Sequence, residues 1–140
     1  MSAANDIVKQ WTEAFRTGDS VAFTNVFATD AIQEHPFFPD AAKGRAEIQG
    51  REAGLFEAFS DITFEARQVT ESGDRAVIEA FVSATNTGPI PTPAGTLPAT
   101  GKRIRLPMAS VVRFNADGSI AEEHRYLDVA GFMGQLGVGG

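Results

Sequence analysis

The chain has 140 residues, 43% of them hydrophobic and 21% charged, which is typical of one soluble globular domain spanning 1–140. Its net charge of -6 argues against a nucleic-acid partner or an acidic membrane, and no apolar run is long enough to cross a bilayer. The absence of cysteine excludes disulfides and thiolate chemistry, and it fits the cytoplasmic location that we expect.

The first half of the chain predicts three helices. The first lies between a cap at position 5 or 6 and a stop at Gly18. Its apolar side chains recur at helical spacing and are Ile7, Trp11, Ala14 and Phe15. A second, shorter helix follows the cap Asp19, and an extended segment covers 31–35. The third helix opens at Gly44, and its inward residues are Ile48, Leu55, Phe56 and Phe59.

The second half predicts strands joined by turns. We expect these strands at 62–70, 76–85, 103–114 and 119–127. A loop rich in proline and glycine occupies 86–101, and a last helical turn at 132–136 precedes a frayed tail at 137–140. Helices followed by hairpin-linked strands are typical of an α+β fold, in which a curved antiparallel sheet wraps around the helices. The space between them is then a cone with one open end.

The last predicted strand carries a dense set of titratable groups. Strand side chains alternate between the two faces of a sheet. One face carries Glu122, His124, Tyr126 and Asp128, and the other carries Glu123, Arg125 and Leu127. Titratable groups are costly to bury without partners. The first of these faces is therefore either solvated, or it lines a pocket and takes part in chemistry.

Seven short segments, spread over almost the whole chain, resemble the SnoaL-like polyketide cyclases in their order and spacing. They are Trp11–Asp19, Phe27–Ala31, Gly44–Ile48, Thr87–Pro89, Thr100–Ile104, Asp117–Ile120 and Tyr126–Asp128. The resemblance implies the cone-shaped, cystatin-like fold of the nuclear transport factor 2-like superfamily, a homodimer, no cofactor and no metal. This fold hosts several enzymes and binding proteins, so the fold alone does not name a function.

Matching the chain to enzymes of this superfamily singles out a few residues. In the cyclases an aspartate late in the last strand is the acid/base, and Asp128 matches it, although aspartate is also a favoured helix cap. In ketosteroid isomerases the base is an aspartate, and His35 occupies the matching position. Their oxyanion tyrosine and protonated aspartate match Trp11 and Ser110, so this chain departs from the isomerase pattern at all three positions. A limonene-type epoxide hydrolase would need a second acid that the segment 103–114 lacks.

The two histidines have more than one interpretation. His35 is a candidate proton shuttle, or else a loop histidine packed on neighbouring prolines. His124 is a candidate donor in the pocket wall, or else one half of a structural cross-strand pair. Two histidines and nearby carboxylates can bind a metal, but no local spacing brings them together, so we expect no metal site. Expected substrate contacts are Trp11, Phe15, Phe56, Ser110 and Tyr126.

The sequence therefore predicts a cofactor-independent acid/base enzyme that acts on a small hydrophobic carbonyl compound in an apolar cavity. The resemblance implies an aldol-type cyclase or an isomerase. Asp128 would take and return the proton, while His35 or Tyr126 would stabilise the enolate. One alternative is a non-catalytic binding module, which needs the cavity but no titratable groups inside it. The others are a ketosteroid isomerase-like activity and an epoxide hydrolase-like activity.

Overall fold

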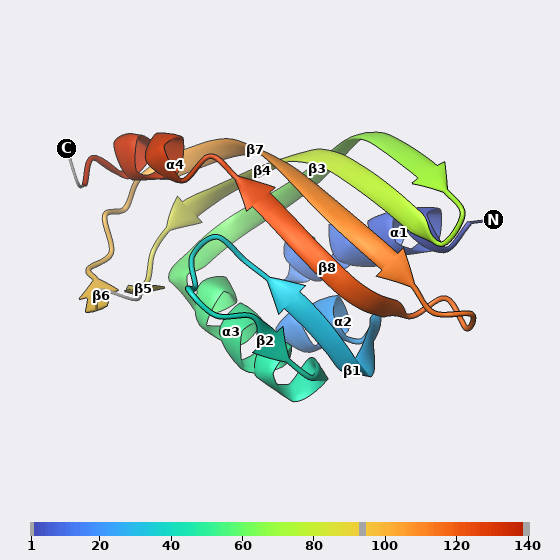
Figure 1. The fold of residues 1–140 in the computed structure, drawn as a ribbon. Coiled ribbons are helices and arrows are strands. Elements are labelled where there is room, and N and C mark those ends of the chain that lie inside the picture. The colour runs from blue at the N-terminus through green and yellow to red at the C-terminus, as the bar shows by residue number, and fades with distance from the viewer. Residues whose placement is uncertain (1, 93–94, 139–140) are drawn as a thin grey trace.

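The computed structural model describes residues 2–92 and 95–138 and confirms the α+β class (Figure 1). Its helices are α1 (Ala3–Thr17), α2 (Ser20–Thr24), α3 (Arg45–Ala58) and α4 (Val129–Leu136). Its strands are β1 (Phe27–Glu34), β2 (Ala42–Lys43), β3 (Phe59–Ser72), β4 (Arg75–Asn86), β5 (Ile90–Thr92), β6 (Gly95–Leu97), β7 (Arg103–Phe114) and β8 (Ile120–Leu127). No helix in this part of the chain is long and apolar enough to cross a membrane.

Six strands form one curved sheet in the order β2-β1-β8-β7-β4-β3. Neighbouring strands are antiparallel except β1 and β8, which run parallel. The helices α1, α2 and α3 lie on one side of this sheet, and its long strands arch over them (Figure 1). The expected curved sheet with a mixed edge, wrapped around N-terminal helices, is confirmed.

Capping interactions set the limits of the first two helices. The α1 helix begins earlier than expected, because the Ser2 hydroxyl accepts a hydrogen bond from the Asn5 amide at 3.1 Å. It ends at Gly18, which has a φ of 69° that favours glycine. The carboxylate of Asp19 caps α2 by accepting from the Ala22 amide, as the sequence predicts.

The strands of the second half extend beyond the sequence prediction wherever a partner strand continues. The β3 strand covers Phe59–Ser72, because β4 pairs with it from Phe59 opposite Asn86 to Ser72 opposite Arg75. The loop expected at 86–101 contains the short hairpin of β5 and β6, whose connecting residues 93–94 lie outside the described residues. Of the tail expected at 137–140, Gly137 caps α4, and 139–140 lie outside the described part.

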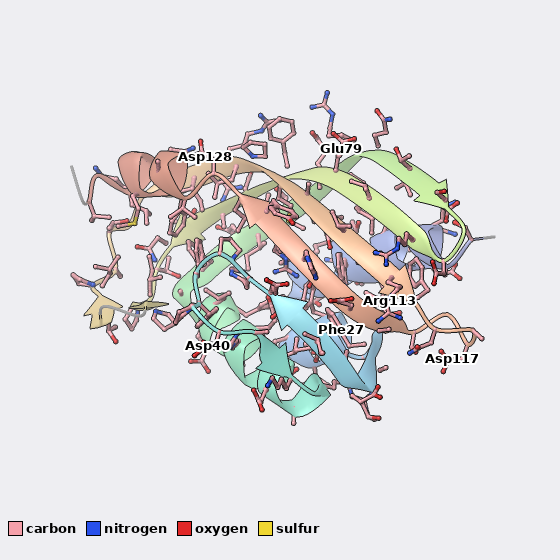
Figure 2. The ribbon with its side chains drawn as sticks, viewed as in Figure 1. Phe27, Asp40, Glu79, Arg113, Asp117 and Asp128 are labelled. Atoms are coloured by element: carbon pink, nitrogen blue, oxygen red, sulfur yellow. The ribbon has the colours of Figure 1, made fainter. Side chains whose placement is uncertain are left out.

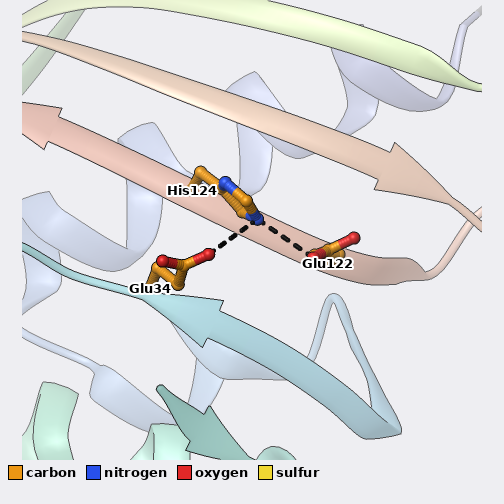
Figure 3. A group of neighbouring side chains, drawn as sticks. All are labelled: Glu34, Glu122 and His124. Carbon is orange, nitrogen blue, oxygen red and sulfur yellow. Dashed lines mark hydrogen bonds and ion pairs between the residues drawn. The ribbon is translucent and has the colours of Figure 1, made fainter. Parts of the chain in front are cut away.

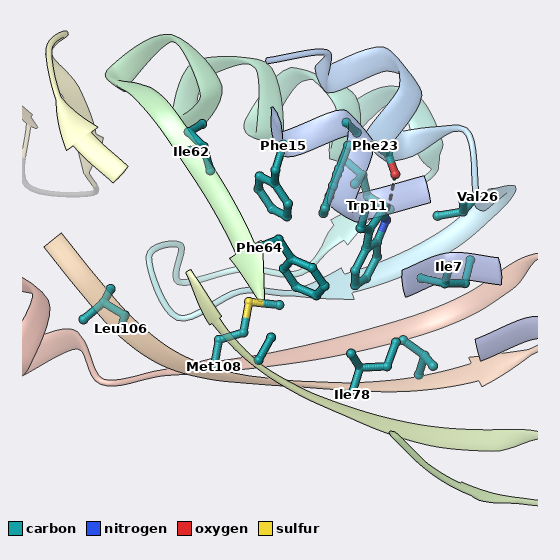
Figure 4. Packing of buried hydrophobic residues seen from close by; sticks show 14 of the residues in the cluster. Ile7, Trp11, Phe15, Phe23, Val26, Ile62, Phe64, Ile78, Leu106 and Met108 are labelled. Atoms are coloured by element: carbon teal, nitrogen blue, oxygen red, sulfur yellow. Dashed lines mark hydrogen bonds between the residues drawn. The ribbon is translucent and has the colours of Figure 1, made fainter. Parts of the chain in front are cut away.

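Aromatic side chains fill the space where α1 and α2 meet the sheet (Figure 4). Trp11 is fully buried, stacks on Phe23 with ring centroids 4.7 Å apart, and donates its indole N–H to the Phe23 carbonyl at 3.1 Å. Phe15 stacks on Phe64 at 5.5 Å and on Phe56 at 5.2 Å. This end of the cone is therefore a solid core, and a cavity lies farther along α3.

Candidate functional site

A cavity of ≈ 90 Å³ lies between α3, α4 and the sheet. Five aromatic rings contribute to its wall, those of Phe15, Phe37, Phe56, Phe59 and Phe132. Val82 and Ala84, small residues of β4, also line it. Among the described residues that line this cavity, three are titratable, and they are His35, Glu52 and Arg125. The cavity is therefore an apolar space with a small group of ionisable side chains in its wall.

Three different elements bring these ionisable groups to the cavity. His35 follows β1 directly, Glu52 lies on α3, and Arg125 lies on β8. On α3, the buried residues Ile48, Glu52 and Leu55 recur at helical spacing, so Glu52 occupies the inward stripe of the helix. Burying three polar side chains would cost folding free energy if they had no hydrogen-bond or ion-pair partners.

Arg125 forms a buried ion-pair network with two carboxylates. Its Nη1 donates to Oε1 of Glu52 at 2.9 Å, and its Nη2 donates to Oε2 of Glu123 at 2.9 Å. Glu123 also accepts from the Ser110 hydroxyl at 2.6 Å and from the Gln33 amide at 3.0 Å. Two carboxylates face one guanidinium, so the fully ionised network carries one uncompensated negative charge.

Burial and neighbouring charges act on this network in opposite directions. Burial raises the pKa of the Glu52 carboxyl above its usual 4.5, the charge of Arg125 opposes this, and the charge of Glu123 reinforces it. Burial alone would lower the pKa of Arg125, but the charges of Glu123 and Glu52 raise it, so the guanidinium stays protonated. Glu52 is therefore the carboxyl in the cavity wall whose proton affinity is increased.

His35 is a neutral hydrogen-bond donor in this environment. It is 5% exposed, and its Nδ1 accepts from the Phe37 amide at 3.1 Å. Burial, reinforced by the charges of Arg125 and Arg51, holds the pKa of His35 well below 6.5. A neutral imidazole that accepts at Nδ1 carries its proton on Nε2. His35 can therefore donate a hydrogen bond from Nε2, but it is a poor proton acceptor.

The predicted substrate contacts divide into two groups. Phe15 and Phe56 line the cavity, together with the candidate catalytic residue His35, and their contact with a substrate stays a prediction. Trp11 and Ser110 are not among the described residues that line it. Trp11 lies in the solid core, and the Ser110 hydroxyl is bonded to Glu123, so each is already committed to a protein partner.

The strand face that carries His124 and Tyr126 points away from the cavity. Glu123 and Arg125 face inward instead, with exposed fractions of 0% and 6%, whereas Tyr126 is 57% exposed. The inward face can be polar because Arg125 forms ion pairs with carboxylates from two elements. The expectation that the face of His124 and Tyr126 lines this cavity is therefore corrected.

Asp128 occupies an exposed position at the junction of β8 and α4 (Figure 2). Its Oδ1 accepts from the Gly131 amide at 2.9 Å, and it is the N-cap of α4. A Cβ at position 131 would come too close to this carboxylate, so the capping side chain would have to shift in a variant without glycine there. Of the two interpretations that the sequence left open, the geometry describes the cap, and Asp128 is not among the described residues that line the cavity.

His124 joins two strands on the outer face of the sheet (Figure 3). Its Nε2 lies 3.0 Å from Oε2 of Glu122 and 3.2 Å from Oε2 of Glu34 on β1. Arg113 approaches Glu122 at 3.6 Å. Within the described chain, Glu34, Glu122 and His124 form a group that could hold a metal, with ligand atoms within 4.8 Å of one another. These contacts link His124 to carboxylates of both strands.

A second hollow, a cleft of ≈ 220 Å³, lies outside the cavity. It is bordered by Glu34, Asp40, His124 and Tyr126, so two of the predicted residues that do not line the cavity, His124 and Tyr126, border this cleft instead. His35 and Arg125 border both spaces. These two side chains are therefore part of a wall shared by the cavity and the cleft.

Sequence reasoning missed Glu52, Glu123 and Gln33. One signal was available for Glu52, which follows Ile48 by four residues and precedes Leu55 by three on the predicted inward stripe. Gln33 shares its strand face with the buried Ala31. No comparable local signal marks Glu123, because its burial depends on Arg125 and on partners from β1 and β7.

Comparisons with known proteins identify the fold and the family. The family model of the SnoaL-like domain matches residues 8–123. One similar solved structure is IdmH, a putative polyketide cyclase from Streptomyces antibioticus, with 25% sequence identity and a TM-score of 0.73 over 96% of this chain and 98% of that one. Another is a putative polyketide cyclase from Pseudomonas putida KT2440, with 21% sequence identity and a TM-score of 0.79 over 96% of this chain and 98% of that one. A third is a Catenulispora acidiphila protein with a ketosteroid isomerase-like fold in complex with trimethylamine. It has 22% sequence identity and a TM-score of 0.76 over 94% of this chain and 92% of that one. The search of curated proteins finds no match.

Proposed function

Because this chain belongs to the SnoaL-like domain family, we propose that it is a cofactor-independent acid/base enzyme acting on a small hydrophobic carbonyl compound. The observation that carries the proposal is the placement of His35 and Glu52, together with Arg125, in the wall of a cavity whose other lining side chains are apolar. Perturbed titratable groups in such a hollow are typical of catalytic sites. The reaction class is isomerisation or aldol-type cyclisation, and the substrate occupies the cavity rather than the outer cleft.

The cavity supplies two features that stabilise an enolate, a hydrogen-bond donor for its oxygen and an apolar wall around that hydrogen bond. His35 donates from Nε2 to the carbonyl oxygen of the substrate and stabilises the negative charge that develops there. The aromatic wall excludes water, which strengthens this hydrogen bond. Such chemistry needs no redox partner, because a proton leaves one atom of the substrate and returns to another.

The size of the cavity restricts the substrate. Its ≈ 90 Å³ is smaller than the roughly 150 Å³ of an engineered cavity that holds benzene. A six-membered ring therefore does not fit whole, and we expect a one-ring or open-chain molecule to place only its carbonyl end inside. The trimethylamine bound by the Catenulispora acidiphila protein supports a site for a small molecule in this fold.

Hydrogen–deuterium exchange at the carbon next to a carbonyl tests the proposal. Cyclohexanone and ethyl 2-oxocyclohexanecarboxylate are incubated with the protein in D₂O and followed by proton NMR. We expect exchange faster than in buffer, and a loss of about 10²-fold in His35→Asn, because asparagine can still accept from the Phe37 amide but lacks the Nε2 donor. Glu57→Gln is the control, since Glu57 is exposed on α3.

The rival function is a binding module without turnover. In that case the probes bind, as ligand-observed NMR shows, but the wild-type protein does not accelerate exchange. This result would reject the enzymatic proposal. Exchange that persists in His35→Asn but disappears in Asp128→Asn would move the chemistry out of the cavity to the end of β8.

A further inference from the structure

We propose that Glu52 is the group that takes and returns the substrate proton, whereas Glu123 is a fixed counter-ion that positions Arg125. This assignment rests on the proposed function and deepens it. It gives two carboxylates on one guanidinium two different roles, which follow from their surroundings. Neither role was expected from the sequence.

The hydrogen bonds around Arg125 are unequal. Glu123 accepts from Nε and Nη2 of Arg125 at 3.1 and 2.9 Å, in addition to the Ser110 hydroxyl and the Gln33 amide. Glu52 accepts from a single nitrogen, Nη1 of Arg125, at 2.9 and 3.3 Å. The oxygens of Glu123 are thus saturated with donors, whereas those of Glu52 retain lone pairs for another proton.

Access to the substrate is unequal as well. Glu52 lines the cavity, and Glu123 is 0% exposed and is not among the described residues of the cavity wall. Glu123 lies instead between β1 and β7, held by Gln33 and Ser110. A proton on a substrate carbon inside the cavity can reach Glu52 but not Glu123.

The charge of the network favours one proton on Glu52. The groups that face it are Arg125 and Glu123, with His35 in the same cavity wall. The fully ionised set has one negative charge in excess, and a proton on Glu52 neutralises it. The raised pKa of Glu52 agrees with this balance and suits a base that must also act as an acid.

The proposed step is balanced within the substrate and the protein. The ionised Glu52 takes a proton from the carbon next to the carbonyl, and the electron pair of that C–H bond forms a C=C bond. The carbonyl π pair moves to oxygen, where His35 donates a hydrogen bond to the enolate. The protonated Glu52 then returns the proton to a different carbon in an isomerisation, or to the new alkoxide in an aldol closure.

Two matched variants test the assignment, with the same carbonyl probes and the same NMR exchange assay. Glu52→Gln leaves the pair of Arg125 and Glu123 intact. We expect it to fold, to bind the probes as the wild type does, and to lose exchange about 10²- to 10⁴-fold. Glu123→Gln removes the charge that reinforces the raised pKa of Glu52. We expect it to retain exchange, with the pH–rate midpoint moved to lower pH.

A second readout does not depend on turnover. In protein labelled with carboxyl-¹³C glutamate, we expect one carboxyl to titrate above its usual pH, to vanish in Glu52→Gln, and to move to lower pH in Glu123→Gln. Glu57→Gln should change neither the titration nor the exchange, because Glu57 is exposed on the same helix.

The outcomes separate this assignment from the function on which it rests. Exchange within about threefold of wild type in a folded Glu52→Gln protein would overturn the assignment and leave the enzymatic function standing. Loss of exchange in Glu123→Gln, with normal exchange in Glu52→Gln, would reverse the two roles. A wild-type protein that binds the probes without exchanging them would overturn the proposed function itself.

Discussion

At the residue scale, His35 and Glu52 give the stability of the protein opposite dependences on pH. The pKa of His35 is lowered well below 6.5 by burial and by Arg125 and Arg51, so the unfolded chain binds more protons below pH 6.5. The burial of His35 therefore destabilises the folded protein as the pH falls below 6.5. The pKa of Glu52 is raised above 4.5, mainly by burial, so its stabilising contribution is complete below 4.5 and is lost as the pH rises through the folded-state pKa.

The two contributions can be separated by urea unfolding at several pH values between 4.5 and 7.5. Acidification should destabilise His35→Asn less than the wild type, because the asparagine does not titrate. It should destabilise Glu52→Gln more than the wild type, because the opposing contribution is removed. Parallel curves for all three proteins would mean that neither side chain is buried as described. Glu57→Gln should follow the wild type.

At the element scale, α4 closes one side of the cavity, and its first turn depends on Asp128. Phe132 extends from α4 into the cavity wall and contacts Phe37 with ring centroids 4.9 Å apart. Leu136 is buried at the other end of the helix. The cap at Asp128 therefore fixes the position of an aromatic residue in the wall, although Asp128 itself does not line the cavity.

Two substitutions at position 128 distinguish a cap from a catalytic base. Asparagine caps helices about as well as aspartate, whereas alanine does not. We expect Asp128→Asn to keep the free energy of unfolding within about 0.5 kcal/mol of wild type, and Asp128→Ala to lose about 0.5–2 kcal/mol, measured by urea denaturation. If Asp128 were the catalytic base, both variants would instead lose hydrogen–deuterium exchange activity to the same extent.

At the scale of the whole molecule, the outer face of the sheet is the expected surface for a second subunit. Tyr126 is 57% exposed there, and Ile32 is 39% exposed. Phe81 lies on the same face between Arg67 and Arg105, whose guanidinium carbons are 5.1 and 3.8 Å from its ring centroid. The homodimer and the cytoplasmic location stay predictions.

Light scattering after size-exclusion chromatography tests the homodimer. We expect a mass of twice the 14.9 kDa of the chain, and a monomer when a charge is placed on this face by Phe81→Glu. Thr17→Glu, an exposed change on α1, is the control, because it lies on the opposite layer of the fold. A wild-type protein that elutes as a monomer at all concentrations would reject the homodimer.

The sequence predicted those elements whose signals are local. The cap at Asp19, the stop at Gly18 and the strand at 103–114 depend on neighbouring residues, and they were found where expected. The strand β2 and the extension of β3 depend on pairing with distant segments, which local patterns do not reveal.

The candidate site was predictable only in part. The sequence places His35 and Phe56 among the candidate site residues, but the variety of titratable groups on one face of β8 does not reveal which partners each of them can reach. Whether Arg125 or His124 faces inward is decided by a carboxylate from α3, far away in the sequence. Which face of β8 points into the cavity therefore depends on tertiary contacts, which the local sequence does not show.

The wall shared by the cavity and the cleft has a consequence for how this fold changes its substrates. His35 and Arg125 border both spaces, so the partition at this point is one side chain thick. A smaller residue in place of the imidazole would thin the barrier between the two spaces, which Arg125 also borders. A longer carbon chain could then extend from the cavity into the cleft, but the same substitution would remove the hydrogen-bond donor that we assign to His35.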